Sequence, residues 1–276
     1  MAFCFVDRIT ALCSDRACGQ LRRAAAAAPL PPWLVIEAVG QLAAWIAIVR
    51  SDFGSRPVAA AVGEVRLDGT DTGGGVDLEA RIDRLDSRAV LYSGTARVDG
   101  AAIAVLERCV GPLLPMQMFD DPRVVRERLA ALRAGWPATG AGGVEGEIPS
   151  AQPSSVELRD GKAQAQLRVP ESAPYFADHF PRRPVYPAAL LADAQNQLAR
   201  GLAARALGVG PEHVQLSRVR DFKVRSFSPP GQVLDLLAEP LPTSDGSAVL
   251  GASVSAAGKR IGSCVLEYRL TRPRAA

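Results

Sequence analysis

The sequence predicts an α+β protein made of two repeated units, each with one long helix against antiparallel strands. The first observation is an internal repeat: residues 31–43 can be laid over residues 187–199 at a constant offset of 156. Seven of the thirteen positions agree, as Pro, Leu, an acid, Ala, Gln, Leu and Ala. The second observation is that apolar, β-branched runs separated by turn residues follow each copy. A chain of 276 residues is long enough for two units of ordinary size.

The first unit is expected to consist of one helix and several strands. Asp99-Gly100 lies between two apolar runs, a pattern typical of a tight hairpin turn. Alternation of apolar and polar residues, broken by glycines, indicates the strands. We expect a first strand or lead-in segment at 3–12, the helix at 30–50, and strands at 58–68, 76–83, 89–98 and 101–109.

The connection between the units is expected to be a short helix followed by an irregular tether. Residues 121–133 are charged and amphipathic, with the apolar side formed by Val124, Val125, Leu129 and Leu132. Residues 135–153 are rich in Gly, Pro, Ala and Ser, a composition typical of linkers. The domain boundaries predicted from these features are 1–119, 120–153 and 154–276.

The second unit repeats the order of elements in the first. It is expected to begin with a hairpin around Asp160-Gly161 and to continue into a loop and a long helix. Gly208 and Gly210 are expected to end that helix near residue 207. Four further strands are predicted at 214–227, 232–239, 248–256 and 260–271.

Composition excludes several classes of protein. No uncharged apolar run reaches the length of about 18 residues that indicates a transmembrane helix, so we expect no membrane insertion. The start of the chain does not resemble a signal peptide. The five cysteines form no paired C-x-x-C set and only two histidines are present, so we expect reduced thiols, a cytoplasmic protein and no metal site. A net charge of +3 permits an acidic partner and does not indicate nucleic acid binding.

The chemistry-bearing stretch is 175–199, which contains His179. A proline-rich turn follows the histidine, and Pro187 suits a helix start, where the first N–H groups have no intrahelical partner. Asp193 lies in the second turn of this helix. A histidine with a carboxylate is a common pair for proton transfer near neutral pH. His213 has no such surroundings and is interpreted as structural.

This stretch resembles the β-hydroxyacyl-acyl carrier protein dehydratases of the hotdog fold. Their signature is roughly H-F-P-G-R-P-V-M-P-G-x-L-x-x-[ED]-A-x-x-Q, and residues 179–197 follow it in one register. Arg182 and Ala188 replace two glycines of the signature, and Tyr186 replaces its methionine. The resemblance implies a double hotdog, in which two sheets each wrap around a long central helix and form a pseudo-dimer within one chain.

The resemblance also implies that the active site lies between two units, with the histidine from one and the acid from the other. This pairs His179 with Glu37, the acid of the first copy. The mirror site would place Asp193 opposite Arg23 and would be inactive. Sequence spacing by itself leaves a pairing of His179 with Asp193 open.

Further site residues follow from the same resemblance. The free amide of Ala188 at the helix start would bind the thioester carbonyl. Gln41 and Gln197, one turn beyond each acid, would hold loops or the acids themselves. Three aromatic residues either line an acyl tunnel or pack in the core: Phe176, Phe180 and Tyr186. Four arginines would form a basic rim for an acidic carrier protein, unless they are an ordinary solvated face: Arg182, Arg183, Arg220 and Arg225.

The expected activity is removal of water from a 3-hydroxyacyl thioester, carried by acyl carrier protein or coenzyme A, to give an enoyl thioester. The resemblance implies fatty acid or polyketide-like biosynthesis and no cofactor beyond the phosphopantetheine that carries the substrate. A thioesterase, an enoyl isomerase and a non-catalytic acyl-binding subunit remain alternatives. The protein would be a monomeric pseudo-dimer or a higher homo-oligomer.

Overall fold

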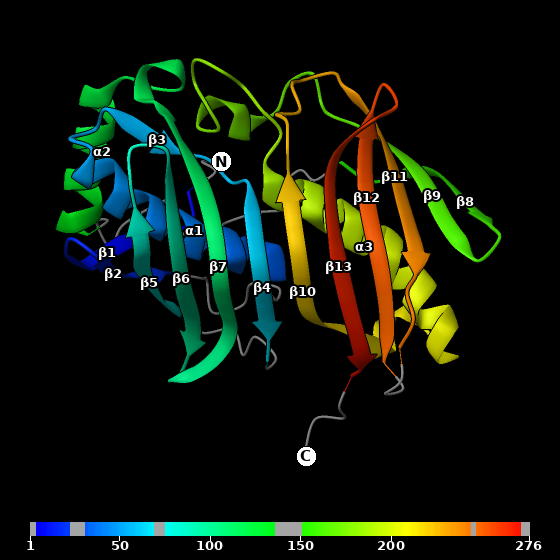
Figure 1. Ribbon diagram of the computed structural model, residues 1–276. Helices are drawn as coiled ribbons and strands as arrows, with labels where there is room; N and C mark the ends of the chain where they lie inside the picture. The colour runs from blue at the N-terminus through cyan, green and yellow to red at the C-terminus, as the bar shows by residue number, and fades with distance from the viewer. Residues whose placement is uncertain (1–3, 23–30, 69–74, 136–150, 244–246, 272–276) are drawn as a thin grey trace.

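The computed structural model describes residues 4–22, 31–68, 75–135, 151–243 and 247–271. Within these residues the strands form a 13-stranded sheet, with both long helices on one side of it (Figure 1). The strand order is β1-β2-β5-β6-β7-β4-β10-β13-β12-β11-β9-β8, and β3 pairs with β7. The two halves of this order mirror each other about the β4–β10 pair. The predicted double hotdog is therefore confirmed.

The N-terminal half wraps one side of the sheet around α1, which lies against β2, β5 and β6. Helix α1 begins at a proline, where no backbone donor is lost, and its buried side chains form the core of this half. Its elements are β1 (Arg8–Leu12), β2 (Arg16–Leu21), α1 (Pro32–Arg50), β3 (Ser55–Pro57), β4 (Ala61–Leu67), β5 (Val76–Leu85), β6 (Ala89–Val98), β7 (Ala101–Pro115), a 3-10 turn (Met116–Met118) and α2 (Pro122–Ala134).

The C-terminal half repeats this arrangement around α3, which lies against β9, β11 and β12. Gly208 ends α3 in the left-handed conformation, as predicted, with φ of 68°. The elements are β8 (Ser154–Arg159), β9 (Lys162–Arg168), a 3-10 turn (Pro174–Ala177), α3 (Ala188–Leu207), a 3-10 turn (Pro211–His213), β10 (Val214–Val224), β11 (Val233–Pro240), β12 (Ala248–Ala256) and β13 (Lys259–Leu270).

Both predicted hairpin turns are present. Asp99-Gly100 joins β6 to β7 with φ values of 49° and 80°, and Asp160-Gly161 joins β8 to β9 with 50° and 74°. Two positive φ angles in succession suit a glycine in the second place and match the twist of the strands. The hairpin between β12 and β13 uses Ala257 before Gly258 in the same conformation.

Several predicted elements were wrong in extent. Of the segment expected at 3–12 as a first strand or lead-in, Arg8–Leu12 forms a strand, and β2 and β3 were not predicted. The strand expected to end at residue 109 continues to Pro115, because its last residues pair with β3. The predicted linker at 135–153 lies mostly outside the described residues, as does the segment 24–28 before the first helix. The predicted domain boundaries therefore stay predictions.

Helix α1 is, among the described residues, the helix long and apolar enough by composition to cross a membrane. In the structure 61% of that stretch is buried, because α1 packs against the sheet and contacts α3 beside it. The core helix of a globular domain passes the same test of length and composition.

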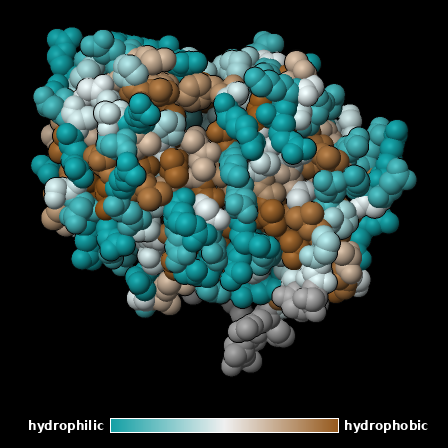
Figure 2. Space-filling model, in the orientation of Figure 1, coloured by the Kyte–Doolittle hydropathy of each residue, from teal (hydrophilic) through white to brown (hydrophobic). Residues whose placement is uncertain are grey.

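The exposed face of the sheet shows hydrophilic side chains gathered over its middle, between two apolar areas (Figure 2).

Candidate active site

A cavity of about 860 Å³ lies where the two halves meet. One face of α1 lines it from end to end, since the lining positions recur every three or four residues. The rest of the wall comes from the start of α3, the loop before it, the N-terminal segment, helix α2 and strands β3, β4, β6, β7 and β10. Most of the wall is apolar, as in pockets that enclose organic ligands. The α1 residues that line the cavity are Trp33, Ile36, Glu37, Gly40, Gln41, Ala44, Trp45 and Ile48.

His179 enters this cavity from the loop between β9 and α3. Two backbone hydrogen bonds fix the loop: His179 N–H donates to Tyr175 O at 2.8 Å, and Val185 N–H donates to His179 O at 3.1 Å. The Nδ1 atom lies 3.1 Å from the carbonyl oxygen of Val185. A carbonyl only accepts, so in the neutral imidazole Nδ1 carries the proton and Nε2 carries the lone pair. The ring can therefore act as a base through Nε2.

Burial sets the protonation of His179. It lowers the pKa of the imidazole to about 4, against the opposing effect of backbone hydrogen bonding. The histidine is therefore uncharged at neutral pH, which is the form that can accept a proton.

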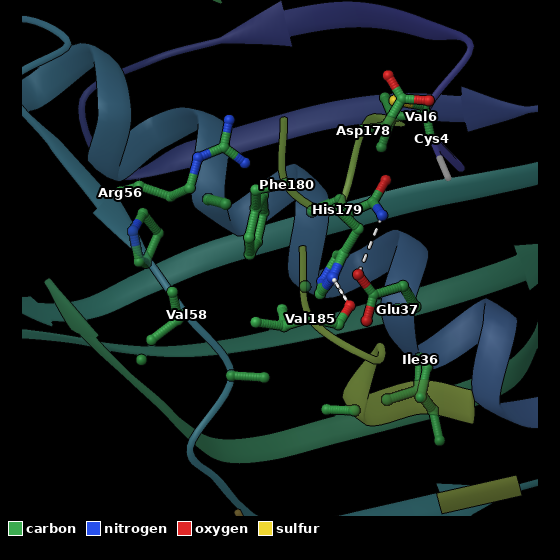
Figure 3. A pocket seen from close by; sticks show the side chains of 18 of the residues that line it. Cys4, Val6, Ile36, Glu37, Arg56, Val58, Asp178, His179, Phe180 and Val185 are labelled. Carbon is green, nitrogen blue, oxygen red and sulfur yellow. Dashed lines mark hydrogen bonds between the residues drawn. The ribbon is translucent and has the colours of Figure 1, made fainter. Parts of the chain in front are cut away.

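Glu37 faces the same cavity from the second turn of α1, beside the histidine (Figure 3). Gln41 Nε2 donates to Glu37 Oε1 at 3.0 Å, and Gln41 Oε1 accepts from Phe5 N–H at 2.9 Å. Gln41 thus ties the carboxyl group to the N-terminal segment. Burial raises the pKa of Glu37, with the bond from Gln41 opposing that change. The carboxyl group therefore keeps its proton to higher pH than an exposed glutamate does.

Asp193 is the equivalent acid on α3 but does not line the cavity. It repeats the local geometry of Glu37, because Gln197 Nε2 donates to Asp193 Oδ2 at 2.8 Å. Its proposed partner in the mirror site, Arg23, lies outside the described residues. The structure thus brings His179 together with the acid of the other half, and leaves the acid of its own helix elsewhere.

The two loops that precede the helices differ in length. Residues 169–187 connect β9 to α3, whereas residues 22–31 connect β2 to α1. The repeat offset holds for the helices and the strands that follow them. It does not hold before the helices, because the loop that carries His179 is the longer of the two.

The N-terminus of α3 meets the cavity next to the histidine. Ala188 and Ala189 line the wall, and Leu191 N–H already donates back to Pro187 O at 3.0 Å. The amides of the first turn before Leu191 precede this pattern and form the positive end of the helix dipole. The predicted position of Ala188 is therefore compatible with binding a carbonyl oxygen.

Of the three aromatic residues predicted to line an acyl tunnel, two line the cavity and one does not. Phe180 and Tyr186 line the cavity. Phe176 does not, so its assignment to the tunnel was wrong. Its ring packs edge-on against Tyr175 at 4.8 Å, because the 3-10 turn directs both rings into the core.

The four arginines predicted to form a basic rim lie in different surroundings. Arg182 and Arg183 are exposed in the loop after Phe180, and the Arg183 guanidinium lies over the Phe227 ring at 4.6 Å. Arg225 is exposed just after β10. Arg220 lies on β10. Its side chain pairs with Glu267 on β13, in a network of ion pairs across the junction of the halves.

Sequence reasoning missed several polar residues in the cavity wall, and three of them come from separate elements. Tyr92 on β6, Arg56 on β3 and Arg128 on α2 all line it. Gly40 leaves space for the phenol, since a Cβ there would lie 3.1 Å from Tyr92 Oη. None of the three belongs to a motif, and strand pairing and helix packing bring them to the site. In the described residues no group of three or more His, Cys, Asp or Glu side chains could hold a metal ion.

The fold and this cavity define the chain as a hotdog-fold protein with two hotdog units in one chain. The ApeI-like family, described as ApeI dehydratase, matches residues 155–250. The chain is also similar to a 3-hydroxyacyl-[acyl-carrier-protein] dehydratase, FabZ, of Rickettsia bellii, at 34% identity over 85 residues. That match covers 30% of this chain and 59% of the Rickettsia protein.

Solved structures match over the full length at low sequence identity. A Lactobacillus plantarum protein described as an oleoyl thioesterase matches with a TM-score of 0.62 and 13% identity, covering 94% of this chain and 97% of its own. A hot dog fold protein of unknown function from Alicyclobacillus acidocaldarius matches with a TM-score of 0.53 and 12% identity, covering 98% of each chain. At such identity the likeness shows the fold alone. The chain is therefore a hotdog-fold protein whose C-terminal half is similar to dehydratases over part of their length.

Proposed function

We propose that this protein removes water from a 3-hydroxyacyl thioester and releases a trans-2-enoyl thioester. One observation carries the proposal: an uncharged histidine and a carboxyl group with a raised pKa, contributed by different halves, face one apolar cavity beside a helix N-terminus. The similarity of the C-terminal half to dehydratases supports the same reaction.

His179 is the proposed base. The bond from Nδ1 to Val185 O directs the Nε2 lone pair away from the loop. In the proposed reaction Nε2 takes a proton from C2 of the substrate, and the electron pair of that C–H bond moves toward the thioester carbonyl. General base catalysis of this kind typically contributes about 10²–10⁴-fold in rate.

Glu37 is the proposed acid. Burial raises its pKa and so favours the protonated form, and Gln41 fixes the orientation of the carboxyl group. The carboxyl group protonates the hydroxyl on C3 as the C–O bond breaks, and water leaves. The C2–C3 double bond forms from the electron pair released at C2, so atoms and charge balance. After the product leaves, His179 gives its added proton to solvent, and Glu37 takes up a proton from solvent.

The first turn of α3 is the proposed site of the carbonyl oxygen. Negative charge develops on this oxygen while the C2 proton is transferred. The amide of Ala188 and the positive end of the helix dipole stabilise that charge. A single donor of this type is typically worth about 10²–10³-fold in rate.

The thioester is proposed to arrive on the phosphopantetheine of an acyl carrier protein or of coenzyme A. The exposed arginines Arg182, Arg183 and Arg225 would meet an acidic carrier, and charge complementarity would raise its rate of association. Acyl carrier protein is part of the names of the Rickettsia relatives. We propose a place in fatty acid or polyketide-like biosynthesis, in the cytoplasm.

Thioester hydrolysis is the second candidate, because double-hotdog neighbours include thioesterases. Hydrolysis would use the same acid and base on a water molecule, so product analysis separates the two reactions. Incubation with a 3-hydroxyacyl thioester should give a product lighter by one water, with an enoyl absorbance and no free thiol. Release of free thiol with a 3-hydroxy acid would instead show a thioesterase. A bound thioester that stays unchanged on both carriers would show a non-catalytic acyl-binding protein.

A further inference from the structure

A three-layer stack of side chains crosses the boundary between the halves behind the histidine. The guanidinium carbon of Arg56 lies 4.8 Å from the centre of the Phe180 ring. Phe180 in turn stacks on His179, with ring centres 4.1 Å apart and planes 25° apart. Arg56 comes from β3 of the N-terminal half, whereas both rings come from the loop of the C-terminal half. Arg56, Phe180 and His179 all carry labels in Figure 3.

Arg56 is enclosed, and its charge is balanced by a small ion cluster. Its side chain is only 14% exposed. Asp120, 5% exposed, lies 3.7 Å from Arg56 and also 3.7 Å from Arg128 of α2. Arg128 reaches Asp178, the residue before the histidine, at 3.6 Å. The cluster therefore holds Arg56 from behind and ties α2 to the histidine loop.

The neighbours of the Arg56 guanidinium group do not hydrogen-bond all of its nitrogen atoms. Arg56 Nε is buried and has no hydrogen-bond partner among the described residues. A planar cation held mainly by charge and by an aromatic face is typical of a cation–π contact, which gains strength when desolvated. The Phe180 ring is thus clamped between the guanidinium and the imidazole.

The cluster also sets the electrostatic surroundings of the histidine. Two separations of 4.8 Å and 4.1 Å place the Arg56 guanidinium carbon within about 9 Å of the imidazole centre. A cation this close disfavours a second positive charge on the ring. Burial is the larger cause of the low pKa of His179, and Arg56 adds to it. The titratable and charged groups that line the cavity around the ring are Cys4, Asp7, Glu37, Arg56, Tyr92, Glu127, Arg128, Asp178 and Tyr186.

We propose that Arg56 is a positioning residue for the His179 base: through Phe180 it fixes the plane of the imidazole, and its positive charge opposes protonation of the ring. The inference rests on the proposed role of His179 in dehydration. It adds a second contribution of the N-terminal half, beside Glu37, to a site whose signature residues belong to the C-terminal half. A hotdog half that lacks its own histidine would in this way still control the base of its neighbour.

The test is a titration of the two histidines by NMR in wild type and variants. The chain has only two histidines, so a His213→Gln background leaves His179 as the single imidazole signal. Arg56→Gln should raise the pKa of His179 by up to about 1.4 units, from Coulomb's law at a separation of about 9 Å and an effective dielectric constant of about 20. Arg56→Lys should keep the pKa near that of wild type, because it keeps the charge.

Kinetics of the same variants test the stacking role. Arg56→Gln and Arg56→Lys should both lower kcat about tenfold with little change in KM, because neither side chain clamps Phe180 as a planar cation does. The matched control is Arg126→Gln, which removes another cation–π pair, the Arg126 guanidinium 4.5 Å from the Phe53 ring centre on the exposed side of α2. That variant should leave both the pKa of His179 and kcat unchanged.

Two results would overturn the inference: an unchanged pKa of His179 in Arg56→Gln, or an Arg56→Lys enzyme with wild-type kcat. If Arg56→Gln does not fold, the Lys variant alone decides, since the proposal requires a lowered kcat at an unchanged pKa. The titration needs no substrate. A shifted pKa in a protein that shows no dehydration would therefore uphold the electrostatic part while refuting the proposed reaction.

Discussion

Replacement of Glu37 by Gln should abolish turnover and stabilise the fold. The change keeps the shape of the side chain and an oxygen that can accept the bond from Gln41, and it removes the proton that the leaving hydroxyl needs. Loss of a general acid typically costs about 10²–10⁴-fold, which corresponds to about 3–5 kcal/mol in the barrier. The assay is formation of the enoyl thioester, followed by absorbance and by mass.

The stability gain follows from the raised pKa of Glu37. Between the pKa of an unfolded glutamate and the higher folded value, the folded state binds more protons than the unfolded state, so its stability falls as pH rises. The glutamine variant lacks this loss. It should match wild type near pH 4.5 and exceed it by about 1 kcal/mol at neutral pH, a typical gain when a strained functional group is removed. Thermal unfolding at several pH values measures the difference.

Asp193→Asn is the matched control. This acid has the same hydrogen bond from a glutamine one turn away, and burial raises its pKa as well. It lies outside the cavity, so the variant should keep turnover within about threefold of wild type while gaining some stability. Turnover that survives Glu37→Gln, or is lost in Asp193→Asn, would refute the pairing of His179 with Glu37.

Further predictions concern pH and packing. The rate should follow a bell-shaped pH profile: an acid limb as His179 is protonated, near pH 4 in the free enzyme, and an alkaline limb as Glu37 loses its proton. Urea unfolding should show stability falling as pH drops below about 6.5, because the unfolded histidine binds a proton that the folded one rejects; a His179→Asn variant should lack about 3 kcal/mol of this loss. Gln41→Leu breaks two hydrogen bonds, so it should cost about 1–3 kcal/mol in urea unfolding and reduce kcat about tenfold. Gly94→Ala should destabilise the protein by more than about 2 kcal/mol, because the added Cβ would lie 2.4 Å from a side chain of α1. Gly201→Ala should stabilise the protein by about 1 kcal/mol, because there is open space around this position of α3 and alanine favours a helix over glycine. Chemical denaturation of both variants measures the two effects.

Much of the fold could be predicted from local sequence patterns. A helix start at a proline, an Asp-Gly pair between apolar runs and a glycine after a helix each act through neighbouring residues, so the sequence predicts them where they stand. The repeat added the long-range step, because two copies of one helix pattern imply two copies of one unit. Weakly patterned segments such as Arg16–Leu21 gain their strand structure from pairing with a strand on each side and were missed.

The candidate site, like the fold, could be predicted from the sequence only in part. The sequence by itself determined that His179 belongs to a dehydratase-like motif, because that motif is contiguous. Only the tertiary structure decided which acid the histidine meets. The pairing of β4 with β10 and the packing of α1 against α3 bring Glu37 to it, and Asp193 points elsewhere although it is closer in sequence. Arg56 and Tyr92 likewise reach the cavity through strand pairing, whose partners lie too far along the chain for any local pattern to name.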